Sequence, residues 1–166
     1  LGDLLKAHKA VLAADAWLFF DGPAHVSGAP QLVLGVRGVM GIDVTFYGPN
    51  RALHSGHYGN WAPNPGVAVA HFIASVRDMD GRIKIAGFYD DVLELTAIEQ
   101  EQYAALPFSE AAFLKEVGSS ATFGEAGRST LVRRTARPTC DINGITGGYK
   151  GEGPKTIIPS KAVAKI

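Results

Sequence analysis

Short apolar runs, each ended by glycine or proline, predict the strands of this chain. Residues 17–20 form a compact apolar run that stops at the turn residues 21–23, which is typical of a buried strand. Residues 31–47 alternate β-branched and aromatic side chains with glycines, which predicts a long strand with bends. Two further strands are expected at 138–146 and 162–166.

Apolar residues at helical spacing predict the helices. A short helix is expected within residues 1–14, and a longer one starts after Asn64, which can cap it, with Pro65 in its first turn. Two more helical patches are expected at 96–106 and 109–117, and the first opens with the Thr-x-x-Glu pattern of a capping box.

The segment from about 83 to 137 is predicted to be an insertion. It contains a short strand, the two helical patches just described and a polar stretch at 118–137. That stretch holds four arginines at its end, Arg128, Arg133, Arg134 and Arg137. Arginines in a polar loop are expected to be solvated surface, with carboxylate binding by bidentate hydrogen bonds as the alternative.

Composition excludes several classes of partner. The 16 Lys and Arg balance 16 Asp and Glu, so neither nucleic acid nor an anionic membrane surface is expected to bind. Charges interrupt every apolar stretch before the roughly 18–20 residues of a membrane span. The single cysteine, Cys140, favours a reducing compartment, so a cytoplasmic protein is expected. The start at Leu1, without Met, and the end at Ile166 inside an alternating run suggest a segment of a longer chain.

Few residues offer chemistry, and each has an alternative interpretation. His54 and His57 lie three apart in a glycine-rich segment, where a histidine can donate to an oxyanion, bind metal or only pack. The glycine-rich loop 147–156 can bring Thr156 near a ligand or be an ordinary hairpin connection. Asp21, after the apolar run, is either a metal ligand or a structural loop residue.

Several motifs, spaced through almost the whole chain, together resemble one enzyme family. They are LGVRG at 34–38, LHSGHYG at 53–59, NGI at 143–145 with GGY at 147–149, and GPKTIIP at 153–159. In this order they resemble the central part of the dinuclear zinc metallopeptidases. This family includes cytosolic dipeptidases, carnosinases, aminoacylases, acetylornithine deacetylase and succinyl-diaminopimelate desuccinylase, and the carnosinase-like dipeptidases are the nearest branch.

The resemblance implies a fold of the α/β class in the form of an α+β sandwich, an antiparallel sheet covered by helices. Residues 1–30 would be the tail of the catalytic metal-binding domain, and 31–166 the lid and dimerisation domain with its insertion at about 83–137. The family's sandwich continues with one more helix and strand beyond this chain. The open sheet edge left by the missing strand, and the family's own assembly, imply a homodimer.

The resemblance also implies roles for four residues. Asp21 matches a metal ligand of a site that holds two zinc ions. His54 matches the lid histidine that stabilises the oxyanion in the partner subunit's active site, and Thr156 a lid position that contacts the substrate. Asn143 is a weaker candidate for substrate binding. The implied reaction is zinc-dependent hydrolysis of a peptide or N-acyl amide bond, with a peptide or N-acyl amino acid as substrate.

Most of the family's catalytic groups lie outside this sequence. These are its His-x-Asp metal motif, its Glu-Glu pair, an arginine and the final metal-binding histidine, so the 166 residues are expected to be inactive alone. Two alternatives from another class stay open: a non-catalytic homodimerisation module, and a small-ligand-binding domain built around loop 147–156.

Overall fold

The computed structural model describes residues 1–18, 28, 30, 33 and 35–166, in two compact units, Leu1–Gly35 and Val36–Ile166. In the first unit α1 spans Gly2–Ala7, which is shorter than the helix expected within 1–14. Trp17 and Leu18 are not in a strand, and the rest of the strand predicted at 17–20 lies outside the described residues. The expected domain boundary near residue 30 stays a prediction.

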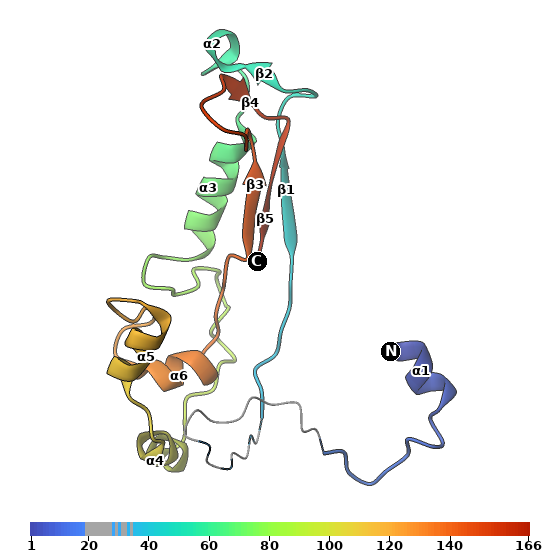
Figure 1. Cartoon of the computed structure of the whole chain (residues 1–166), viewed down its shortest axis with the longest axis vertical. Helices are drawn as coiled ribbons and strands as arrows, with labels where there is room; N and C mark the ends of the chain where they lie inside the picture. Colours follow the sequence, from blue (N-terminus) through green and yellow to red (C-terminus); the bar gives the residue numbers. More distant parts are fainter. Residues whose placement is uncertain (19–27, 29, 31–32, 34) are drawn as a thin grey trace. The chain divides into compact units, whose positions relative to one another are not determined.

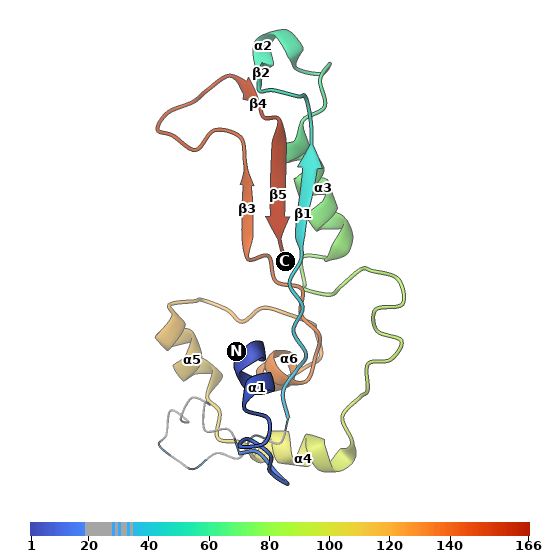
Figure 2. The same ribbon diagram turned by 90° about the vertical axis from the view of Figure 1, so that its right-hand side faces the viewer.

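A three-stranded antiparallel sheet in the order β1-β5-β3 carries the second unit (Figures 1 and 2). Its strands are β1 (Asp43–Tyr47), β3 (Gly144–Gly147) and β5 (Lys161–Lys165). On one face Val44 pairs with Ala164, which in turn pairs with Ile145. The expectation of helices with an antiparallel sheet is confirmed.

Two strands are much shorter than the sequence pattern predicts. Among the described residues of the strand expected at 31–47, which are 33 and 35–47, only 43–47 form a strand. Of 138–146 only the last three residues belong to β3. Both pair with β5, which is five residues long. An alternating pattern shows that a segment suits a strand, but the strand ends where its hydrogen-bonding partner ends.

Helix α3 (Pro65–Val76) covers one face of the sheet (Figure 1). As predicted, Asn64 is the N-cap of this helix, and its side-chain oxygen accepts a hydrogen bond from the Gly66 N–H at 3.0 Å. Val69 is 1% exposed and packs with Ala162 and Ala164 of β5. Phe46 and Ile73 border this small core. Alternate residues of β5, the middle strand of the sheet, therefore pack against the helix.

A separate ribbon of two strands lies between β1 and β5 in the chain: its first strand follows β1, and its second strand precedes β5. It consists of β2 (Leu53–His54) and β4 (Ile157–Ile158), and the short helix α2 (Ser55–Tyr58) continues directly from β2. The chain passes closely at Gly48, where a Cβ would lie 2.7 Å from Pro65 Cδ. Glycine is required at position 48 because any side chain there would clash with Pro65 at the start of α3. Helix α2 was not predicted from the sequence.

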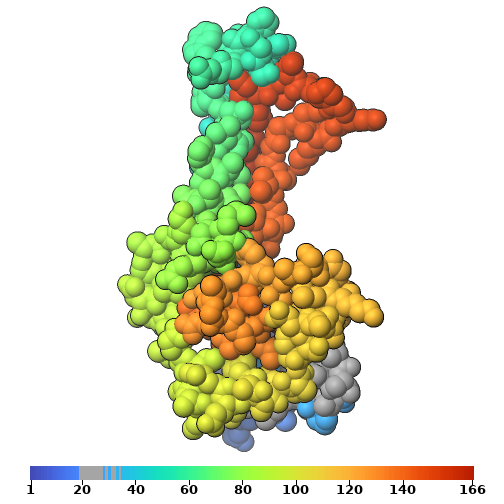
Figure 3. All heavy atoms as spheres, turned by 90° about the vertical axis from the view of Figure 1, so that its left-hand side faces the viewer, coloured from blue at the N-terminus to red at the C-terminus, as the bar shows by residue number. Residues whose placement is uncertain are grey.

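The segment 83–137 contains three helices, α4 (Ala97–Ala105), α5 (Glu110–Val117) and α6 (Thr130–Thr135). The capping box of α4 is confirmed. The short strand expected near residue 83 is reduced to one bridge between Arg77 and Ile83. Figure 3 shows the stretch 118–137, in orange, packed against the preceding yellow-green residues. No helix in the described part of the chain is long and apolar enough to cross a membrane.

Candidate functional site

The structure brings His54 and Thr156 together although they are 102 positions apart in the sequence. His54 ends β2 and pairs with Ile157 of β4, so Thr156, just before β4, lies beside it. Thr156 Oγ1 is 3.1 Å from His54 Nε2, and both residues are exposed. The two strongest candidates from the sequence thus form one polar pair that a ligand can reach.

Three neighbours hold the His54 ring. Its Nδ1 atom accepts a hydrogen bond from the Gly56 backbone N–H at 3.0 Å, so His54 is itself the N-cap of α2. The His57 ring packs against it, with 4.6 Å between ring centroids and 43° between planes. Thr156 contacts the opposite nitrogen. The sequence indicated both histidines but not their contact.

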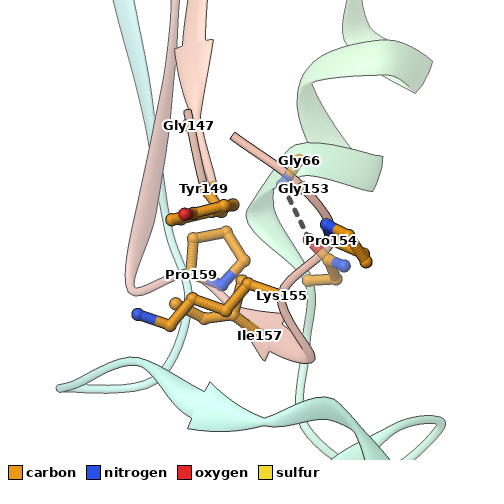
Figure 4. A pocket seen from close by; sticks show the side chains of 10 residues that line it. Gly66, Gly147, Tyr149, Gly153, Pro154, Lys155, Ile157 and Pro159 are labelled. Atoms are coloured by element: carbon orange, nitrogen blue, oxygen red, sulfur yellow. Dashed lines mark hydrogen bonds between the residues drawn. The ribbon is translucent and has the colours of Figure 1, made fainter. Parts of the chain in front are cut away.

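The glycine-rich loop between β3 and β4 borders a cavity of about 450 Å³, whose lining includes Lys155 and Ile157 but neither Thr156 nor His54. Figure 4 shows Tyr149, Pro159 and Lys155 on one side of it, and Gly153 with Pro154 near the first turn of α3 on the other. The Lys155 ammonium lies 5.3 Å from the centre of the Tyr149 ring. A lysine and a glycine-rich backbone around an open cavity suit contact with a polar ligand.

The other two candidates are not brought to His54. Asn143 precedes β3, and its backbone N–H donates to the Lys165 carbonyl at 2.8 Å. It therefore lies at the end of β5 opposite to Thr156, roughly 10 Å or more away at about 3.3 Å per residue. Asp21 is outside the described residues. Among the residues that the structure describes, no group of three or more His, Cys, Asp or Glu could hold a metal ion, so these residues do not form a zinc site.

For Arg137, the prediction that the arginines of 118–137 are solvated is wrong. The four arginines of 118–137 were expected to be solvated, but Arg137 is only 7% exposed. Its Nε and Nη2 atoms donate to Glu125 at 2.9 and 3.1 Å, and Nη1 donates to Glu94 at 3.1 Å. The guanidinium also lies 5.5 Å from the centre of the Tyr89 ring. Burial is possible because two carboxylates compensate the charge.

A second arginine of this group is also engaged by the chain's own carboxylates. Arg128 donates through both terminal nitrogens to Glu94, the longer contact being 2.8 Å. The hydrogen bond from Arg128 is the largest cause that holds the pKa of Glu94 below its ordinary value; burial opposes it, and the charges of Arg128 and Arg137 add to it. Arg128 and Arg137 are therefore already paired, which disfavours the alternative that they bind a substrate carboxylate. The partners are 34 and 43 positions away in the sequence, so no local pattern signals them.

Comparison with known proteins gives a consistent picture. The sequence model described as the peptidase dimerisation domain matches residues 34–166. The Cys-Gly metallodipeptidase of Schizosaccharomyces pombe is 31% identical over 168 residues, which cover 100% of this chain and 35% of that protein. The beta-Ala-His dipeptidase of Homo sapiens is 26% identical over 137 residues, 82% of this chain and 27% of that protein. The chain spans between about a quarter and a third of the length of these curated relatives.

Solved structures agree. A metallo-carboxypeptidase of the M20 family from Sulfolobus solfataricus superposes with a TM-score of 0.83 and 32% identity, over 99% of this chain and 43% of that chain. The dipeptidase Dug1p from Saccharomyces cerevisiae gives a TM-score of 0.67 and 29% identity, over 74% of this chain and 26% of that chain. The resemblance drawn from the motifs is confirmed, and so is its implied fold.

Proposed function

Because the chain belongs to the peptidase dimerisation-domain family, we propose that it is the lid and dimerisation part of a metal-dependent dipeptidase or related amidohydrolase. The parent enzyme hydrolyses a peptide or N-acyl amide bond, and its substrate is a peptide or N-acyl amino acid. The observation that carries this proposal is the exposed pair of His54 and Thr156, which the pairing of β2 with β4 brings together. Its relatives, named as a Cys-Gly and a beta-Ala-His dipeptidase, support the substrate class.

In this proposal His54 stabilises the oxyanion of the tetrahedral intermediate. An imidazole N–H aimed at that oxygen acts on charge that develops only in the transition state, so it raises kcat rather than tightening ground-state binding. Thr156 contacts the substrate from the same side. The exposure of both residues supports a role in the active site of a partner subunit, since a second chain can reach them.

In this proposal most of the metal ligands belong to other parts of the parent enzyme. The relatives are metallodipeptidases by name, and the proposed cofactor is zinc, two ions per site, with Asp21 as one ligand. The described residues contain no set that could hold these ions, so the role derived for this part of the chain is binding and charge stabilisation alone.

The proposed assembly is a homodimer, in the cytoplasm as the single cysteine favours. Within the described residues β1 and β3 each pair only with β5, which leaves an outer edge of each strand free. Free edges present unpaired N–H and C=O groups to another chain. A dimer would also bring the His54 and Thr156 of one subunit to the catalytic half of the other.

The first test is His54→Ala in the parent enzyme. Loss of one oxyanion donor is expected to lower kcat by about 10²–10³-fold with little change in KM. His71→Ala, at an exposed position on α3, is the matched control and is expected to leave both constants unchanged. Turnover that survives His54→Ala would remove the catalytic role and favour the alternative of a non-catalytic dimerisation or ligand-binding module.

A further inference from the structure

The contacts of His54 determine which ring nitrogen carries the proton. The Gly56 backbone N–H can only donate, so Nδ1, at 3.0 Å, must accept with its lone pair. A neutral imidazole has one protonated nitrogen, which is then Nε2. The proton on Nε2 points to Thr156 Oγ1 at 3.1 Å, so the threonine hydroxyl is the acceptor in that hydrogen bond.

The backbone at residue 56 is shaped to make this contact. A Cβ at Gly56 would lie 2.8 Å from His54 Cε1 and 3.1 Å from Nδ1, so any side chain there would push the ring off the amide. The His57 ring, 4.6 Å from the His54 ring, limits rotation on another side. The ring is thus held by the turn that immediately follows it.

The arrangement leaves donors available to a ligand. A hydroxyl that accepts one hydrogen bond still has its own proton to donate. When an anionic oxygen approaches, the Thr156 O–H can rotate to donate to it, and the His54 Nε2–H can be shared between Thr156 Oγ1 and the same oxygen without rotation of the ring.

We propose that the Gly56 backbone amide is a positioning group that fixes His54 as the Nε2–H tautomer. His54 and Thr156 then form a two-donor site for a single anionic oxygen. The identity of that oxygen, the oxyanion of amide hydrolysis, rests on the proposed function, whereas the tautomer does not.

The test is nitrogen NMR of the full 166-residue chain labelled with ¹⁵N-histidine. At a pH where the ring is neutral, His54 is expected to show Nε2 at the position of a protonated nitrogen and Nδ1 at that of an unprotonated one. Comparison with the spectrum of His54→Asn identifies its resonances. Gly56→Ala is expected to shift both resonances toward the average of the two tautomers.

Gly41→Ala is the control, because a Cβ there meets nothing closer than 3.8 Å, and it is expected to leave the His54 signals in place. If Gly56→Ala fails to fold, the unaltered chain still decides: a predominant Nδ1–H tautomer overturns the inference. Equal effects of the Gly41 and Gly56 substitutions would overturn it as well.

A kinetic readout in the parent enzyme separates the inference from the proposed function. Thr156→Val is expected to lower kcat more than it changes KM, and Thr156→Ser, which keeps the hydroxyl, to restore most of the rate. A Thr156→Val enzyme with unchanged kcat would overturn the two-donor site. An Nε2–H tautomer together with full turnover by His54→Ala would support the positioning by Gly56 and remove only the catalytic role.

Discussion

Arg137 is a charged residue buried within segment 83–137. Its side chain is 8% exposed, and that of its main partner, Glu125, is 18% exposed. Tyr89 is covered by two guanidinium groups, that of Arg82 at 4.6 Å and that of Arg137 at 5.5 Å from its ring centre. Arg137 and Glu125 are both largely removed from water, so loss of the Arg137 charge would leave the Glu125 carboxylate with weaker compensation.

We therefore expect Arg137→Ala to lower the free energy of unfolding by about 3 kcal/mol, because the partly buried Glu125 carboxylate loses both hydrogen bonds from Arg137 and keeps only the longer ion pair with Arg82, at 3.5 Å. Arg128→Ala, which breaks a pair with a Glu94 side chain that is 60% exposed, is the control and should lower the free energy of unfolding much less, because water screens that pair. Urea denaturation followed by circular dichroism measures both. Similar losses for the two variants would contradict the assignment of Arg137 as a buried structural charge.

At the scale of residues, the sequence allowed candidate site residues to be predicted from their own segments. It did not allow the burial of a residue to be predicted where that burial depends on partners distant in the sequence. His54 was singled out by its glycine-rich segment, and both His54 and Thr156 by the resemblance of their motifs to one family; the structure brings the two together. The burial of Arg137 was missed because its acceptors, Glu94 and Glu125, are 43 and 12 positions away.

At the scale of elements, the start of α4 depends on a titratable group. The Thr96 N–H donates to the Glu99 carboxylate at 2.7 Å, and this bond, followed by that from the Thr96 hydroxyl, holds the pKa of Glu99 below its ordinary value. Because the folded-state pKa is the lower one, the carboxylate stabilises the helix start above the unfolded-state pKa. That stabilisation is lost as the pH falls through the folded-state value.

The Thr96 amide proton is therefore expected to titrate with an apparent pKa below that of an ordinary glutamate, because the charge that it senses is Glu99. Proton NMR from neutral to acid pH measures this shift. Glu99→Gln keeps a capping side chain without a charge and should abolish the titration while α4 stays formed. A Thr96 amide that titrates at the ordinary glutamate value, or continues to titrate in Glu99→Gln, would refute the capping account.

Helices were predicted from the sequence better than strands, for a physical reason. The caps at Asn64 and Thr96 are local, so their residues fix where α3 and α4 begin. The extent of β1 and β3 depends on β5, from another part of the chain, and the sequence pattern of 31–47 holds no information about that partner. Helix α2 was missed because its four residues are too few for a periodic pattern.

At the scale of the whole molecule, the proposed function makes this chain one half of a shared active site. The chain supplies the sheet, the covering helix α3 and the His54–Thr156 pair, whereas the proposed metal site and general base belong to the rest of the parent enzyme. The central claim is that His54 acts on the substrate bound by the other subunit.

Mixed dimers of the parent enzyme test this claim most directly. One subunit carries His54→Ala and the other carries Asp21→Ala, which disables its proposed metal site. If His54 acts in the partner's site, the intact metal site of the first subunit meets the intact His54 of the second, so the mixed dimer is expected to keep about half of the wild-type kcat while each pure mutant dimer is inactive. A mixed dimer as inactive as the two pure mutants would show that His54 serves its own subunit and would contradict the account.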